Sequence, residues 1–514
     1  MQGKKSLSPQ LFYQVSLDQL VPEDNFYRQL GKALDLGYLY KATAAYYGRE
    51  GQQSIDPIVF FKILLVGYLN NINSDRALIR FCADRLGIRL FLGYDLQEQL
   101  PCHSTISRTR QLYGEETFLQ LFQQVLKMCI DKGMVRGKRQ CVDSAFIKAN
   151  ASMDSLVEKE ILDDASAFVD EFDENSEFKV ATTRKKLVDQ HHAWKAETFK
   201  DMPGASTIAR FDEDGKWYPS KVPDQPHALQ SHWSRCKDQC KARQLNYAGQ
   251  IAVDDAHHVI TGAVASTAGT KDSMILPEIV DQTIENLKDN FLQMDELVAD
   301  AGYSSWEALQ YLEHKNINAW IPNFGQYKFE REGFFYNEEL DQYKCVKEGG
   351  NHAVLPFKKQ SITTKGHELK SYRSSETDCK TCPLREQCIG SKTAFKKINH
   401  TIHKPLYDKM HRKISENKSY HRWLVKRRSS AVEPVLGTLI NFHNMQRINS
   451  RGMDQARKHV LMAALTYNLK KYLKFTTRKA LALVMAMEIK SAQAFLFLLQ
   501  AAIVSFFSFR VPQK

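Results

Sequence analysis

The chain has 514 residues, of which 43% are hydrophobic and 25% are charged, and these values are ordinary for a globular protein with room for about two to four domains. They exclude a largely disordered chain. Lysine and arginine exceed aspartate and glutamate by 71 − 59 = 12, which favours a polyanionic partner such as a nucleic acid, although a merely soluble basic protein is the plainer alternative.

Neither end of the sequence predicts a membrane segment. The start, residues 1–7, lacks the apolar core and the cleavage site of a secretory signal. The most apolar stretch, residues 492–509, is interrupted by glutamine and serine and predicts a packing or partner helix rather than a span. We therefore expect a cytoplasmic protein, with no membrane partner, whose ten cysteines are reduced.

Helical periodicity dominates the first part of the chain. Apolar residues recur at helical spacing over residues 58–69 and 77–86. The segment 101–110 starts with hydroxyl residues and ends in arginines, a composition typical of a helix that contacts DNA phosphates. We expect Arg108 and Arg110 to contact DNA, and a charged, solvent-exposed helix face is the alternative.

A predicted helix over residues 118–128 leads to the first of two short apolar runs that each end in an aspartate. These runs are residues 140–143, ending in Asp143, and residues 296–300, ending in Asp300, and both read as buried strands. Taken singly, either aspartate is more simply a strand-end turn or a helix cap.

The sequence predicts a hairpin and a helix between those two strands. Residues 247–253 and 258–265 are strand-like, and the turn that joins them holds Asp254 and Asp255, which backbone turn preferences explain without catalysis. Three further elements are expected: a helix over 273–287, a helix over 305–313 and a strand over 318–322. The resulting order, β-β-β-α-β-α-β, is typical of a sheet with helices on its faces.

A polar insertion, about residues 155–243, separates the first strand from the hairpin and reads as helices and loops. Within it His232, Cys236 and Cys240 would share one helical face. Chance is the better interpretation of this spacing, because no fourth residue is placed to complete a metal site.

Four cysteines lie in an aromatic, lysine-rich region over residues 323–400. Cys379 and Cys382 are separated by two residues, Cys388 follows, and Cys345 precedes them on a predicted strand. Thiolates at this spacing can close a tetrahedral site, so we expect a structural Zn²⁺, with reduced free thiols as the alternative. A redox pair is less favoured, because the context is not a strand-to-helix thioredoxin turn.

The third acidic residue, Glu433, follows a basic helical segment over residues 403–423 and the pair Arg427 and Arg428. Aromatic residues interleave these cations, which favours neutralisation of a bound DNA backbone over a solvated helix face. The spacing from Ser430 to Glu433 also fits a capping box at a helix start, the simpler interpretation of Glu433 alone.

The contexts of the three acids together resemble the acidic boxes of bacterial insertion-sequence DDE transposases, nearest to the IS eleven-eighty-two group. The resembling segments are residues 142–152, 299–304 and 432–437. The resemblance implies an α/β fold, with an RNase H-like mixed β-sheet flanked by helices, an all-α N-terminal DNA-binding domain and a cysteine-containing insertion.

The resemblance and the element pattern together predict five segments. They are a helical DNA-binding domain over 1–136, the first part of the catalytic core over 137–322, the cysteine insertion over 323–400, the C-terminal part of the core over 401–473 with Glu433, and a helical tail over 474–514. The apolar face of the tail suggests packing or dimerisation.

The resemblance also implies the chemistry. Asp143, Asp300 and Glu433 would be the catalytic residues and would hold two Mg²⁺ or Mn²⁺ ions, with Asp143 bridging both. The expected substrate is double-stranded DNA, namely the terminal repeats of the transposon and the target, bound by a homodimer or a higher oligomer. A nuclease of the same fold without strand transfer and a non-catalytic DNA-binding remnant are the alternatives.

The chain departs from the family pattern after Glu433. Family members usually carry a lysine seven residues after this glutamate, where the chain has Ile440, and a phenylalanine where it has Leu436. Either Arg447 or Arg428 would then supply the charge that contacts phosphate.

Overall fold

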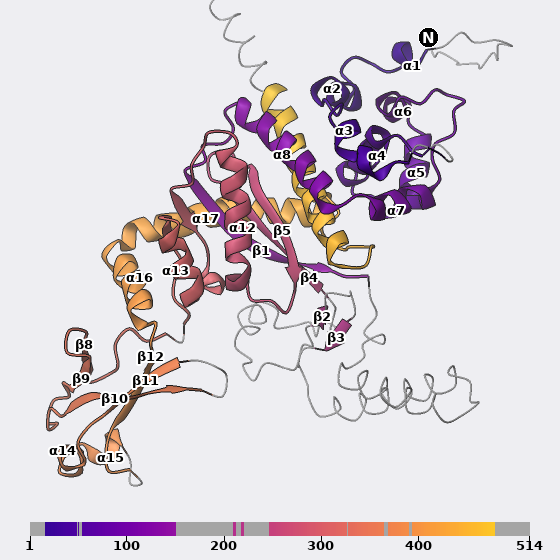
Figure 1. Cartoon of the computed structure of the whole chain (residues 1–514). Coiled ribbons are helices and arrows are strands. Elements are labelled where there is room, and N and C mark those ends of the chain that lie inside the picture. The colour runs from indigo at the N-terminus through magenta and orange to yellow at the C-terminus, as the bar shows by residue number, and fades with distance from the viewer. Residues whose placement is uncertain are drawn as a thin grey trace, which may run out of the picture.

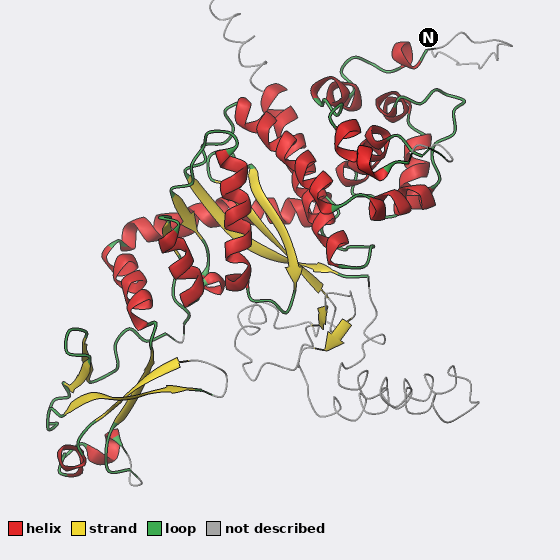
Figure 2. Ribbon diagram, viewed as in Figure 1, coloured by secondary structure: helices red, strands yellow, loops and turns green. Residues whose placement is uncertain are grey.

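The computed structural model describes residues 16–48, 50, 54–150, 209–211, 217–219, 246–325, 327–363, 368–389 and 393–477. In these ranges the chain forms a group of N-terminal helices, a central five-stranded sheet with helices against it and a second five-stranded sheet (Figure 1, Figure 2). The expected insertion, with its histidine and two cysteines, lies outside the described residues except for a hairpin of β2 (Ala209–Phe211) and β3 (Trp217–Pro219). Most of the tail also lies outside them.

The N-terminal helices pack around α4 (Pro57–Leu69). Asp56 begins α4 by accepting hydrogen bonds from the backbone N–H groups of Ile58 and Val59, and Pro57 occupies the first position, where its missing N–H is not needed. The remaining elements of this region are α1 (Leu17–Leu20), α2 (Phe26–Ala33), α3 (Leu39–Thr43), η1 (Ala44–Tyr46), α5 (Asp75–Ala83), α6 (Leu86–Leu92), α7 (His103–Leu112) and α8 (Glu115–Asp131). α4 is apolar on most sides and buried, yet neither it nor any other described helix is long and apolar enough to cross a bilayer.

The central sheet has the strand order β5-β4-β1-β6-β7. Its strands are β1 (Arg139–Lys148), β4 (Asn246–Asp254), β5 (Ile260–Thr267), β6 (Glu296–Val298) and β7 (Asn318–Trp320). β1, β4 and β5 pair antiparallel, whereas β6 and β7 run parallel to β1. Parallel strands need crossover connections, which are α12 (Asp272–Lys288) and α13 (Trp306–His314). The predicted order of strands and helices is therefore confirmed.

Two C-terminal helices follow the second sheet, and the longer of them returns to the central sheet. They are α16 (Lys404–Glu416) and α17 (Lys418–Phe442), and α17 contacts β1. Because α17 starts at Lys418, Ser430 and Glu433 lie inside the helix, and the capping-box interpretation is wrong. The hydroxyl of Ser430 instead donates a hydrogen bond to the carbonyl of Arg427 at 2.9 Å.

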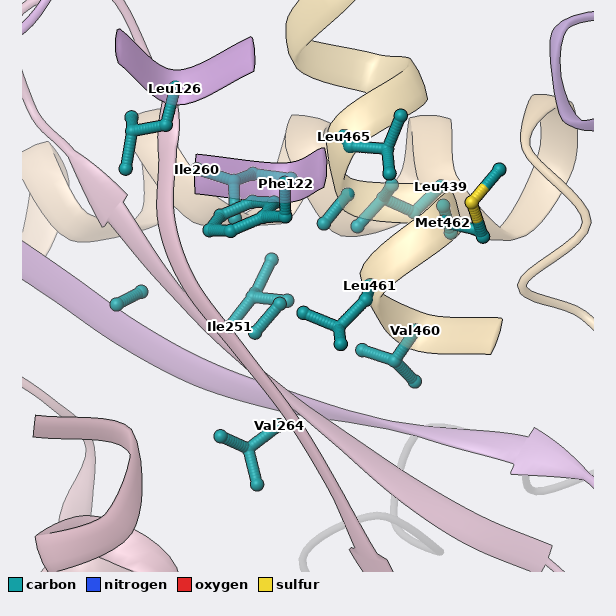
Figure 3. Packing of buried hydrophobic residues seen from close by; sticks show 14 of the residues in the cluster. Phe122, Leu126, Ile251, Ile260, Val264, Leu439, Val460, Leu461, Met462 and Leu465 are labelled. Atoms are coloured by element: carbon teal, nitrogen blue, oxygen red, sulfur yellow. The ribbon is translucent and has the colours of Figure 1, made fainter. Parts of the chain in front are cut away.

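The N-terminal helices and the central sheet share one hydrophobic core (Figure 3). Phe122 on α8 is fully buried and packs in the same cluster as Ile251 on β4 and Leu461, which belongs to a helix over residues 453–477. Helix α8 thus covers the sheet, although it precedes the first strand of that sheet in sequence.

The second sheet lies between β7 and α16 in sequence and has the order β12-β11-β10-β9-β8. Its strands are β8 (Phe334–Asn337), β9 (Gln342–Cys345), β10 (Val354–Ile362), β11 (Glu368–Arg373) and β12 (Lys397–Thr401), with the short helices α14 (Glu376–Lys380) and α15 (Arg385–Cys388). It has a separate small core of six buried residues, namely Phe334, Tyr343, Cys345, Leu355, Tyr372 and Ile398.

Candidate active site

Two of the three predicted acids meet at the centre of the central sheet. Cys141 on β1 pairs with Val298 on β6 in parallel register, and Asp143 and Asp300 each lie two residues further along. Side chains two residues apart on a strand point to the same face, so the two aspartates come together at equivalent positions. Asp300 then caps the turn η3 (Ala301–Tyr303) by accepting a hydrogen bond from the N–H of Gly302 at 2.8 Å.

The carboxylate of Asp143 is mostly buried and pairs with a cation from α17. A guanidinium nitrogen of Arg428 lies 2.7 Å from a carboxylate oxygen of Asp143, and the two side chains are only 14% and 18% exposed. Burial raises the pKa of Asp143, the charge of Asp300 raises it further, and Arg428 opposes both effects. The neighbouring carboxylates of Asp143 and Asp300 therefore share one nearby cation, Arg428.

A third aspartate, Asp272, joins this group although nothing in the sequence singled it out. It is the first residue of α12, and its carboxylate accepts hydrogen bonds from the hydroxyl of Ser144 at 3.2 Å and from the side-chain amide of Gln250 at 2.5 Å. Burial raises the pKa of Asp272, and the charge of Asp300 adds to this. An acid at a helix start is common for backbone reasons, so the sequence carries no signal for this role.

Tyr303 and Gly302 show how closely the aspartates converge. The hydroxyl of Tyr303 donates a hydrogen bond to Gln250, and burial together with the charges of Asp272, Asp143 and Asp300 raises its pKa well above the ordinary value. A Cβ atom added to Gly302 would lie 3.0 Å from Asp300 and 3.4 Å from Asp272, so glycine fits between the two carboxylates.

Glu433 lies on α17, five residues after Arg428, and its side chain is exposed. It accepts a hydrogen bond from the hydroxyl of Ser429 at 2.7 Å. In the part of the chain that the structure describes, no three acidic, histidine or cysteine side chains are close enough together to hold a metal ion. The structure thus brings Asp143 and Asp300 together with Arg428 and leaves Glu433 facing solvent on the same helix.

Comparisons with known families match both ends of this architecture. Residues 15–112 match the family described as Transposase domain (DUF772), and residues 350–473 match the family described as Transposase DDE domain, a segment that includes α17 with Arg428 and Glu433. The chain carries a transposase DDE domain. The DDE domain makes the protein an enzyme, implies an RNase H-like core and DNA as the partner, and is typical of enzymes that use a divalent metal. A search of curated proteins finds no match to the chain.

The arginines expected to contact DNA in the transposase have different surroundings. Arg110 is bound to Asp75 at 2.6 Å and is 20% exposed, so its charge is already neutralised within the helical region. Arg108 is exposed, and among the residues that the structure describes its guanidinium donates only to Ser104, on its own helix. The exposed Arg447 donates to the side-chain oxygen of Asn150 at 2.7 Å.

Arg427 and the two acids of the hairpin turn have structural partners. Arg427 donates to the carbonyl of Asp255 at 2.9 Å, and the Asp255 carboxylate also pairs with Arg139 at 2.9 Å. Asp254 accepts hydrogen bonds from the backbone N–H groups of Gly137 and Ala256. Asp254 thus serves the backbone of the turn, as expected, whereas the Asp255 carboxylate pairs with arginine side chains.

The four predicted cysteine ligands of the second sheet line one pocket. Cys345 ends β9, Cys379 lies on α14, Cys388 ends α15 and Cys382 lies between the two helices, and all four are free thiols. The hydroxyl of Ser374 lies 3.0 Å from the sulfur of Cys379. The fold therefore gathers thiols that are up to 43 residues apart in sequence (388 − 345 = 43).

Proposed function

We propose that the transposase binds the ends of its insertion sequence, cleaves them and joins the 3′ ends to target DNA. The observation that carries this proposal is the position of Asp143 and Asp300 on adjacent parallel strands at the centre of the sheet. A sheet order of three antiparallel strands followed by two strands parallel to the first supports an RNase H-like core. From the acidic boxes we also infer membership of the IS eleven-eighty-two group.

Asp143, Asp300 and Glu433 are the residues that would hold Mg²⁺ or Mn²⁺, with Asp143 shared between two ions. Their oxygen donors suit these hard cations, and a bound cation would offset the burial and the repulsion from Asp300 that raise the pKa of Asp143. Glu433 would exchange its hydrogen bond with Ser429 for this role. When bound, two such ions activate the attacking water or 3′-hydroxyl and stabilise the leaving oxygen.

Ser144, Gln250 and Asp272 fix the surroundings of the two aspartates. Since Asp272 accepts from both Ser144 and Gln250, it orients the residue next to Asp143 and the amide that Tyr303 contacts. We assign Asp272 a positioning role in the reaction, because buried hydrogen-bonded networks of this kind hold the groups they surround in one geometry.

Basic residues on α17 and near it would bind the DNA backbone. Arg428 neutralises Asp143 in the free protein and would turn to a DNA phosphate once the carboxylate is otherwise engaged. Arg427, Arg447 and Arg108 are further contacts that we propose, whereas the ion pair of Arg110 with Asp75 is better suited to fixing α7 against α5. Joining two ends to one target needs two active sites, so we propose a homodimer or a higher oligomer on DNA.

The second sheet would hold a structural Zn²⁺ through Cys345, Cys379, Cys382 and Cys388. The support is the common pocket that these four thiols line, and because they are too far apart in the described structure to hold a metal ion, they would move together on binding. Tetrahedral thiolate sites of this kind contribute directly to the stability of small folds.

Full-length protein incubated with Mg²⁺, a plasmid that carries the gene with its own flanking DNA and a second, target plasmid tests the function. We expect cleaved ends and joined products, and loss of both by about a thousandfold in Asp143→Asn, Asp300→Asn or Glu433→Gln, since metal assistance contributes several kcal/mol to such reactions. DNA binding should persist in all three variants.

Each other outcome of that experiment has a defined meaning. Nicked plasmid without joined products indicates a nuclease rather than a transposase, and the absence of any cut indicates a DNA-binding remnant. A variant that cuts at the wild-type rate shows that its residue is not a metal ligand.

A further inference from the structure

A pocket of about 600 Å³ lies between the N-terminal helices and the C-terminal part of the core. Helices α4, α5 and α7 contribute one wall, and the loop after α17 with the start of the helix over residues 453–477 contributes the other. Asn150, just beyond the end of β1, also lines it. The pocket is therefore formed only when the two regions come together.

The charge of the pocket lining is strongly positive. Four cations line it, namely Arg76, Arg110, Arg451 and Lys458, against one acid, Asp75. Arg110 already pairs with Asp75, which leaves three cations without a carboxylate among the lining residues. Arg451 is exposed and makes no ion pair with any residue that the structure describes.

Lys458 is the most informative of these cations. Its side chain is only 3% exposed, and its ammonium donates to the carbonyl of Arg110 at 3.3 Å and lies 5.8 Å from the ring centre of Phe118. An ammonium has three donors, and a buried charge that forms no ion pair is costly, although the charges of Asp454 and Glu115 partly favour it. Burial accordingly lowers the pKa of Lys458. An anion in the pocket would remove this cost.

Side-chain amides form the rim of the pocket and connect its two walls. Asn150 donates to the carbonyl of Asn449 at 2.9 Å, and Asn449 donates to the carbonyl of Asn73 at 2.7 Å. Neutral amides and arginines are common contacts to the phosphates and sugars of DNA. The rim thus adds hydrogen-bonding groups suited to a nucleic-acid backbone.

We infer that this pocket binds a backbone phosphate of the same DNA that reaches Asp143, an inference that rests on the proposed function. The argument for DNA, rather than a free anion, is continuity with the active site. β1 carries Asp143, and Asn150 follows it by seven residues, a distance of about 23 Å along a strand, which equals roughly seven base pairs of B-DNA. The pocket would hold the duplex about two thirds of a turn from the site of cutting and align the helical region with the core.

Binding of DNA without cutting tests the inference. Full-length Asp143→Asn protein, without divalent ions, is titrated into a fluorescein-labelled duplex of about 30 base pairs at several salt concentrations. Adding Arg451→Met or Lys458→Met should lower affinity about threefold to tenfold and reduce the slope of log K against log salt by about 1, as expected for one lost phosphate contact. Lys132→Met, an exposed lysine at the far end of α8, is the matched control and should change neither.

A stability measurement separates binding from a structural role. Lys458→Met should raise the melting temperature of the free protein while it weakens DNA binding, because it removes a buried charge that forms no ion pair with any described residue. If Lys458 had a structural role instead, Lys458→Met would lower both the melting temperature and the affinity for DNA. Arg451 is exposed, so its variant reports on binding even if Lys458→Met fails to fold.

Two results would overturn the inference. One is an unchanged affinity and salt slope in Arg451→Met. The other is competition by inorganic phosphate, at constant ionic strength and low millimolar concentration, which would assign the pocket to a free anion. Since the assay needs no cleavage, a failure of the proposed catalytic residues would leave its outcome unaffected.

Discussion

The central sheet and the second sheet of the transposase bury very different fractions of their strands. In the central sheet β4 and β5 are buried at nearly every position, because α8 and the helix over residues 453–477 cover one face and α12 packs against the other. In the second sheet β10 is exposed at seven of nine positions. A large core supplies enough stability to offset the repulsion between neighbouring carboxylates. The stability of a small sheet depends more on polar contacts and, in our proposal, on a bound metal.

Polar groups compensate for the small core of the second sheet. Tyr343 forms a hydrogen bond with Nδ1 of the buried His400 and Tyr372 forms one with Nε2, and Tyr372 also donates to Asp341. Burial raises the pKa of Asp341, but hydrogen bonds from Tyr372, Lys370 and Tyr336 outweigh it and lower the pKa to about 2. The cysteine pocket lies beside the same core.

Removing the metal should have the largest effect and should affect the second sheet alone. A structural Zn²⁺ contributes about 10 kcal/mol or more in small zinc-dependent folds. We expect elemental analysis to find one Zn²⁺ per chain, and Cys379→Ser or Cys382→Ser to lose it and to expose the second sheet to proteolysis. Cys102→Ser, an exposed thiol of the helical region, is the control. Intact protein without zinc or a comparable metal would end this proposal.

Truncating a side chain of the shared hydrophobic core should have the next largest effect. Phe122 is fully buried, so Phe122→Ala should lower the free energy of unfolding by about 3–5 kcal/mol. Hydrogen exchange should increase in the N-terminal helices and the central sheet together. Phe442→Ala, at an exposed position, should change stability by less than about 0.5 kcal/mol. Exchange that increases in the helices alone would show that they fold independently of the sheet.

Low pH should lower the free energy of unfolding of the N-terminal helices and the central sheet, which together we call the central body. The responsible residue is His459, which joins these helices to the core. It is buried, contacts the hydroxyl of Tyr68 and the carbonyl of Asn444, and its pKa is lowered to about 4 by burial. The folded state binds the proton less tightly than the unfolded state, so stability is complete above about pH 6.5 and falls as the pH drops toward 4, by up to about 3 kcal/mol.

Chemical denaturation at several pH values measures this effect. In His459→Gln, the unfolding free energy of the central body should depend less on pH between about pH 6.5 and 4. In the second sheet, burial also lowers the pKa of His400 to about 4, and His400→Gln should flatten the pH dependence of that sheet instead. An identical pH dependence in both variants and in the wild type would show that other groups control acid sensitivity.

Asp272→Asn should have the smallest effect among these predictions and should act on the reaction rather than the fold. Loss of a group that positions metal ligands typically costs about 10-fold to 100-fold in metal affinity or activity. We expect the concentration of Mn²⁺ needed for half-maximal cutting to rise and DNA affinity to stay constant. A changed maximal rate at saturating Mn²⁺, with unchanged half-saturation, would contradict a positioning role.

The sequence alone predicted the order of strands and helices in the central sheet, because alternation, helical spacing and turn residues are local signals. It also marked Asp143 and Asp300, since each ends an apolar run, and the resemblance to transposases joined them to Glu433. Arg108 and Arg110 looked alike in sequence, yet only the fold pairs Arg110 with Asp75.

The tertiary structure decided what depends on distant partners. Asp272 enters the site through hydrogen bonds to Ser144 and Gln250, residues 128 and 22 positions away, which no local pattern encodes. The burial of Lys458 and the pocket around it exist only where the N-terminal helices meet the last helix of the core. Local sequence fixes backbone preferences, whereas desolvation and charge pairing depend on which segments the fold brings together.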